Sequence, residues 1–246
     1  MKNIYIVLTQ SGTDISRLIK LFTHDKYNHS SICIDEDFEK LYSFGRIYLN
    51  SPIPGGFIIE NAFTHVFGKY KRVPCMILKK EITDEQYEKA VDTIQEFIDN
   101  QKKYKYDYIN MVLAQTPFEV PHKNRFFCSE FVGYILQSCG IQNPSKLEKI
   151  RPIWFTKIEG AEVVYEGILE DWCKEKSAFG DIPLARTKGH VRGHPLKWLR
   201  QQVFLQEKFC ESFPDSKNNW ISKTRKSQLE SRFQLAFSVF LKKLFF

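Results

Sequence analysis

Short apolar strands and amphipathic helical stripes alternate along residues 3–171, and this alternation stops near Trp172. Apolar residues with a period of two indicate strands, whereas apolar residues spaced three and four apart indicate helices. The pattern therefore predicts an α+β domain over residues 1–171, with an antiparallel β-sheet packed against helices. Residues 172–246 are predicted to be a basic, partly helical C-terminal extension.

Several segments have the apolar composition and the turn-residue boundaries of strands. They are residues 3–8, 29–34, 40–49, 73–82 and 162–169. The second and third of these are predicted to form a β-hairpin, because an acidic turn (DED) lies between them. The sequence SPIPGG, residues 51–56, is typical of a loop, and the following GFIIENAF is a short extended piece.

Helix-start signals occur at two places in the middle of the domain. Thr83 and Gln86 have the spacing of a capping box, so a helix is predicted to begin there. Asp107 is predicted to cap a second helix, which Pro117 would end. Apolar residues with helical spacing also run through residues 14–22 and 128–140.

Charge is distributed unevenly. The whole chain has a net charge of +7, but residues 1–171 contribute −2 and residues 172–246 contribute +9. The basic extension could contact an anionic membrane surface or could be a solvated segment. Its lack of a regular aromatic and basic spacing argues against nucleic acid. One helical face near its end suggests a core or partner-binding helix, or alternatively a helix at a membrane interface. That face consists of Phe233, Phe237, Phe240, Leu241 and Leu244.

The sequence contains neither a run of eighteen apolar residues nor a pattern typical of a secretion signal, so we expect a cytoplasmic protein. Its six cysteines form no CxxC pair and no cluster with histidine, so we expect reduced thiols and neither a metal nor an organic cofactor.

Cys128 lies where a loop turns into the apolar helix FFCSEFVGYIL. At the start of a helix, unpaired N–H groups and the positive end of the helix dipole stabilise a thiolate. The same groups can stabilise an oxyanion when sulfur attacks a carbonyl. A buried, inert cysteine facing Ile135 and Leu136 would give the same sequence pattern, so this segment alone leaves both interpretations open.

His29 is the candidate base, because it begins a strand in which His29, Ser31 and Cys33 share one face. An exposed edge strand would show the same alternation. If the hairpin turn is centred on Glu36, Ser43 lies opposite His29 and is the candidate third residue that orients the imidazole. Glu60 is the alternative for that role.

The order of these segments resembles the circularly permuted papain-like fold, in particular the NlpC-like cysteine hydrolases of the YiiX type. The resemblance covers residues 3–171. It rests on TQSGTDISRLIKLFT before YNHSSICI, on LYSFGR in the next strand, on YKYDYINM before FFCSEFVGYIL, and on AEVVYEGIL near the end.

The resemblance implies that Cys128 is the nucleophile and His29 the general base. In this family the third polar residue stands on the strand after the histidine, often as Glu, His or Asn, so Ser43 is a departure. The expected activity is that of a cysteine peptidase or amidase that forms an acyl-thioester. The alternatives are a lipid acyltransferase or phospholipase of the same fold, and a binding module without activity. The substrate would be peptide-like or an acyl lipid.

Overall fold

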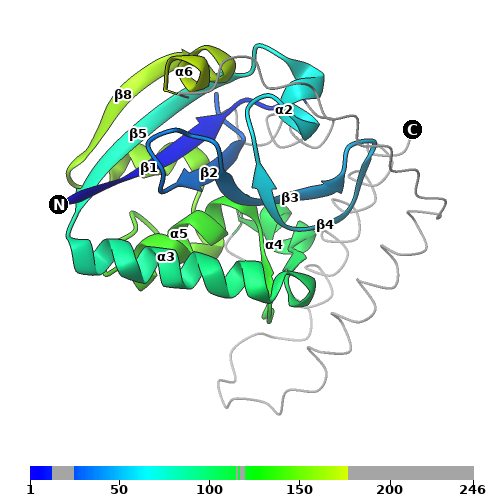
Figure 1. The fold of residues 1–246 in the computed structure, drawn as a ribbon. Helices are drawn as coiled ribbons and strands as arrows, with labels where there is room; N and C mark the ends of the chain where they lie inside the picture. Colours follow the sequence, from blue (N-terminus) through cyan, green and yellow to red (C-terminus); the bar gives the residue numbers. More distant parts are fainter. Residues whose placement is uncertain (13–24, 115, 117–119, 177–246) are drawn as a thin grey trace. The chain divides into compact units, whose positions relative to one another are not determined.

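A computed structural model of the chain describes residues 1–12, 25–114, 116 and 120–176. Within these residues, six strands form one antiparallel sheet in the order β4-β3-β2-β1-β5-β8 (Figure 1). The strands are β1 (Lys2–Thr9), β2 (His29–Cys33), β3 (Leu41–Tyr48), β4 (Ser51–Glu60), β5 (Pro74–Ile82) and β8 (Ala161–Ile168). A separate parallel pair consists of β6 (Lys105–Tyr106) and β7 (Arg125–Phe126).

Helices cover both faces of the six-stranded sheet, with α3 and α5 on one side and α6 on the other (Figure 1). The helices are α2 (His65–Tyr70), α3 (Asp84–Asp99), α4 (Tyr108–Leu113), α5 (Cys128–Ser138) and α6 (Leu169–Lys176). None of the helices within the described ranges is both long enough and apolar enough to span a membrane.

Residues 4–8 of β1 are hydrophobic without interruption, and both faces of this stretch are buried. Tyr5 and Val7 belong to a core cluster that includes Trp172 and Cys173 of α6. Ile4 and Ile6 alternate with them, so they point to the face covered by α3 and α5, and both are fully buried. The predicted domain boundary after residue 171 thus falls inside α6, and the globular core includes side chains beyond it.

An aromatic cluster attaches α3 and α5 to the sheet. Phe131 of α5 lies 5.3 Å from Phe44 of β3, 5.6 Å from Phe57 of β4 and 5.0 Å from Phe97 of α3, measured between ring centroids. All four rings are at most 1% exposed. Because Phe131 is one turn along α5 from Cys128, this packing fixes where the helix start lies over the sheet.

The strands and helices predicted within the described residues are present, including the Thr83–Gln86 capping box. The loop predicted for residues 51–56 is wrong, since β4 begins at Ser51. Its prolines are compatible with pairing because β4 is an edge strand. Helix α4 ends at Leu113, four residues before Pro117. The helix predicted for residues 14–22 and the C-terminal face from Phe233 lie outside the described residues.

Candidate active site

Cys128 occupies the first position of α5, and its side chain is buried, with 4% of the residue exposed. The preceding residue, Phe127, is the N-cap and has no side chain that could accept a hydrogen bond from the helix. Glu130 compensates in part, because its Oε2 accepts a hydrogen bond from the Phe127 N–H at 3.3 Å. Cys128 is therefore free of a capping role, and its sulfur accepts hydrogen bonds from the backbone N–H groups of Ser30 and Ser129.

His29, at the start of β2, is held by the carboxylate of Glu60, the last residue of β4. His29 Nε2 lies 2.8 Å from Glu60 Oε2, and the Ser31 hydroxyl donates to the same oxygen at 2.8 Å. Both acid and imidazole are largely buried, with 7% and 13% of their side chains exposed. A carboxylate in this position fixes the ring and stabilises its protonated form.

The imidazole of His29 is hydrogen-bonded to Cys128, and the two residues shift each other's pKa. Burial lowers the pKa of His29, but the charge of Glu60 and the hydrogen bond to Cys128 outweigh it and raise the pKa to about 10. Burial raises the pKa of Cys128, yet His29 and the backbone N–H groups of Ser30 and Ser129 lower it below the ordinary thiol value. Both shifts are in the direction that favours transfer of the Cys128 proton to His29, which gives a thiolate paired with an imidazolium.

Ser43 does not orient His29, and the predicted hairpin register is wrong. Ile32 pairs with Tyr42, which places Ser43 beside Ser31 instead of His29. The fully buried Ser43 hydroxyl donates to the backbone oxygen of Ser30 at 2.7 Å. The structure thus brings His29 together with Cys128 and with Glu60, the alternative third residue, while Ser43 supports the backbone of β2.

Tyr106 is a neighbour of the sulfur that the sequence did not single out. Its hydroxyl lies 3.2 Å from Met111 Sδ and also within hydrogen-bonding reach of the Cys128 sulfur, so its single proton can be donated to either sulfur. Burial and the negative charge of Cys128 keep the pKa of Tyr106 well above its ordinary value, so the phenol remains a donor. The sequence YKYDYINM contains a signal for this residue. Alternation along β6 buries Tyr106 and exposes Lys105.

A second histidine, His122, links the segments that carry Tyr106 and Cys128. Its Nε2 lies 3.1 Å from Glu130 Oε1 on α5, and its Nδ1 lies 3.3 Å from Oδ2 of Asp107, the N-cap of α4. Burial lowers the pKa of His122, but the hydrogen bond to Glu130 and both acidic charges raise it to about 9. The charged imidazole thus bridges two buried carboxylates that stabilise the starts of two helices.

Replacing His122 with glutamine should destabilise the protein at pH 6 by about 3 kcal/mol, because a pKa raised from 6.5 to about 9 corresponds to that stabilisation. The contribution of a raised histidine pKa is complete below 6.5 and disappears as the pH rises through about 9. Urea unfolding at pH 6 and pH 9.5 measures the difference. The exposed neighbour variant Lys123→Gln is the control, and equal destabilisation by His122→Gln at both pH values would contradict the assignment.

The other described cysteines lack these partners. Cys33, Cys75, Cys139 and Cys173 are buried free thiols, and burial raises the pKa of each of them. Cys210 lies outside the described residues. Across the described ranges, no group of three or more His, Cys, Asp or Glu side chains is arranged to hold a metal ion. Comparison with protein-family models and with curated proteins gives no match for this chain.

Proposed function

We propose that the protein is a cysteine hydrolase with a permuted papain-like domain, and that it cleaves an amide bond in a peptide-like substrate. One observation supports this proposal most directly. A cysteine at a helix start has a lowered pKa, is hydrogen-bonded to a histidine, and that histidine is held at 2.8 Å by a buried carboxylate. Enzymes that use nucleophilic catalysis have the same arrangement, in which a nucleophile contacts a base and the base contacts an acid that orients it.

The reaction would begin with transfer of the Cys128 proton to His29, which the directions of the two pKa shifts favour. Sulfur attacks the carbonyl carbon, and the carbonyl π-electrons move to oxygen, giving a tetrahedral oxyanion. As the oxyanion collapses, the C–N bond breaks and the His29 imidazolium gives its proton to the leaving amine. Water, deprotonated by the neutral imidazole, then attacks the thioester and releases the acid and the thiolate.

Donors for the oxyanion surround the sulfur. The N–H groups of Ser30 and Ser129 are hydrogen-bonded to the Cys128 sulfur, and the hydroxyl of Tyr106 can donate either to that sulfur or to Met111 Sδ. Their positions are set by β2, α5 and β6, so these groups need little reorganisation when charge develops on a substrate oxygen. Removing a single donor of this kind typically costs about 10²–10³ in rate.

Trapping the acyl-enzyme tests the proposal. The full chain is mixed with a panel of acyl-peptide amides and acyl esters, quenched in acid and analysed by intact and peptide mass spectrometry. We expect the mass of one acyl group on the peptide containing Cys128, and its removal by hydroxylamine, which cleaves thioesters. The acyl class that accumulates separates an amidase from an esterase or acyltransferase.

The matched control for this experiment is Cys139→Ala, because Cys139 lies at the other end of the same helix and burial raises its pKa. Cys139→Ala should acylate normally, whereas Cys128→Ala should not acylate at all. Acylation that persists in Cys128→Ala would contradict the proposed nucleophile. No acylation and no turnover with any member of the panel would favour the binding module.

A further inference from the structure

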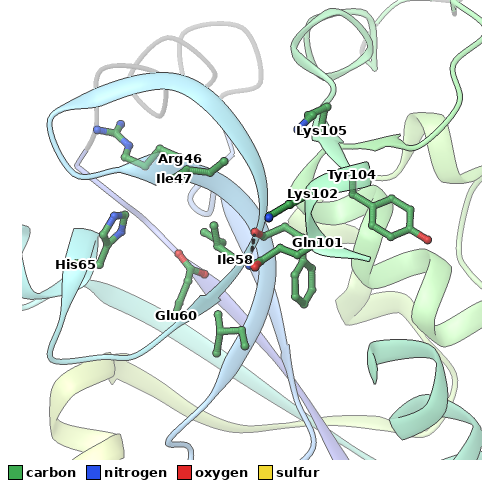
Figure 2. Close-up of a pocket in the computed structure, with 11 residues that line it drawn as sticks. Arg46, Ile47, Ile58, Glu60, His65, Gln101, Lys102, Tyr104 and Lys105 are labelled. Atoms are coloured by element: carbon green, nitrogen blue, oxygen red, sulfur yellow. Dashed lines mark hydrogen bonds between the residues drawn. The ribbon is translucent and has the colours of Figure 1, made fainter. Parts of the chain in front are cut away.

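A basic pocket that includes Glu60 lies between the β3–β4 hairpin and the segment that follows α3 (Figure 2). Its volume is about 470 Å³. Arg46, Lys102 and Lys105 contribute positive charge, and Glu60 contributes the negative charge, so these side chains carry two net positive charges. Figure 2 shows these residues around one opening, with His65 on the side of α2.

Within the described residues, the three cations of this pocket form no ion pair with an acidic side chain. None of the ion pairs among the described residues involves Arg46, Lys102 or Lys105. The carboxylate of Glu60 is already hydrogen-bonded to His29 and Ser31, so the part of the chain that the structure describes supplies no counter-charge paired with these cations. A pocket whose walls hold uncompensated positive charge concentrates anions.

Apolar side chains accompany the cations along the same walls. Ile47 and Ile59, on β3 and β4, line the pocket and are 43% and 47% exposed. Phe57 and Ile58 complete the apolar part, and the Gln101 side chain donates to the Phe57 backbone oxygen at 3.3 Å, joining the two walls. Concave sites with apolar walls and few polar groups are typical of small-molecule binding.

The pocket and the catalytic residues share structural elements. Glu60 lines the pocket and holds His29. On β6, Lys105 lines the pocket, while the next residue, Tyr106, is hydrogen-bonded to Cys128. Gly56 allows β4 to approach the backbone at Tyr104 closely, because a Cβ at position 56 would lie only 3.0 Å from the Tyr104 backbone oxygen. A molecule bound here would contact Glu60, the residue that holds His29.

We propose that this pocket binds an oxyanion, a phosphate or carboxylate group, on the substrate of Cys128, with an apolar part of the substrate against Ile47 and Ile59. The inference rests on the proposed hydrolase function for its link to Cys128. The guanidinium of Arg46 and the two ammonium groups supply the charge-assisted hydrogen bonds that such a group requires.

Four matched probes test the inference: the N-hexanoyl amino-acid amides of phosphoserine, glutamate, serine and glutamine. Binding is measured by titration calorimetry at low salt, in the full chain carrying Cys128→Ala to prevent turnover. We expect the two anionic probes to bind at least about tenfold more tightly than their neutral partners, with the preference reduced by added salt. Tighter binding of phosphoserine than of glutamate would identify phosphate as the preferred group, and the reverse order would identify carboxylate.

Charge-removing variants locate the site. Lys102→Gln and Lys105→Gln should each weaken anionic-probe binding about 2–5-fold, and the triple variant with Arg46→Gln should remove the preference. Lys174→Gln, at an exposed position on α6, is the matched control and should bind like the parent. Equal binding of anionic and neutral probes, or a preference that survives the triple variant, would overturn the inference. These measurements need no turnover. If the anionic probes bind but no acyl-enzyme forms, the proposed hydrolase function is refuted and the proposed anion binding in the pocket is not.

Discussion

Iodoacetamide should alkylate Cys128 faster than the other cysteines at pH 7, and His29→Ala should slow that reaction at least about tenfold. Thiolate, and not thiol, is the reacting form. His29 is the main group that lowers the pKa of Cys128, against a burial that raises it. Without the imidazolium the largest contributions that lower the pKa of Cys128 are lost while burial still raises it, so the thiolate fraction at neutral pH falls.

The pH dependence has a defined direction. Because the pKa of Cys128 is lowered, its alkylation should persist as the pH falls below the ordinary thiol range. The pKa of His29 is raised to about 10, so the ion pair should last until the pH rises through about 10, where the imidazolium loses its proton. In His29→Ala the rate of Cys128 alkylation should instead stay low at neutral pH and rise only when the pH approaches or exceeds the ordinary thiol pKa.

Peptide mass spectrometry of timed, quenched samples gives the rate at each cysteine in one experiment. Cys139 is the internal reference, since burial raises its pKa and its thiol donates to the backbone oxygen of Ile135 in the same helix. Its slow rate should be the same with and without His29. A Cys128 that is inert, or that reacts equally fast in His29→Ala, would show that the thiol is only a small buried side chain.

Local signals in the sequence were sufficient for most elements and for two of the site residues. The Thr83 side chain accepts a hydrogen bond from the Gln86 N–H, and the Gln86 side chain accepts one from the Thr83 N–H. The start of this helix therefore needs no contact with a distant part of the chain. The position of Cys128 at a helix start follows in the same way from its apolar stripe. The period of two correctly placed His29 and Ser31 on one face of β2, where both reach Glu60.

The hairpin register depended on an interaction that local patterns do not contain. The pairing of Ile32 with Tyr42 centres the turn on Asp37, one residue beyond the predicted centre. Phe38 has a positive φ of 56° and is 2% exposed, with its ring 5.5 Å from Trp172 of α6. Burying this ring against a helix more than 130 residues away in the sequence fixes the turn, and with it the neighbour of Ser43.

Replacing Glu60 with glutamine should impair the site far more than replacing Ser43 with alanine. Glu60→Gln keeps the shape of the side chain but removes the charge that raises the pKa of His29. The pKa of His29 should fall towards its ordinary value, Cys128 alkylation at pH 7 should slow, and turnover of any amide substrate should fall by about 10²–10⁴. NMR titration of the histidine ring measures the first effect, and alkylation kinetics measures the second.

Ser43→Ala is the matched comparison, because it changes a buried hydrogen bond on the neighbouring strand without changing any charge. It leaves the Ser30 backbone oxygen without this donor, so we expect a stability loss of about 1 kcal/mol and a rate change of less than about threefold. The opposite result, with Ser43→Ala impaired and Glu60→Gln unaffected, would exclude Glu60 as the orienting residue. Orienting the imidazole requires a carboxylate in contact with it. Glu60 meets this requirement because its Oε2 lies 2.8 Å from His29 Nε2.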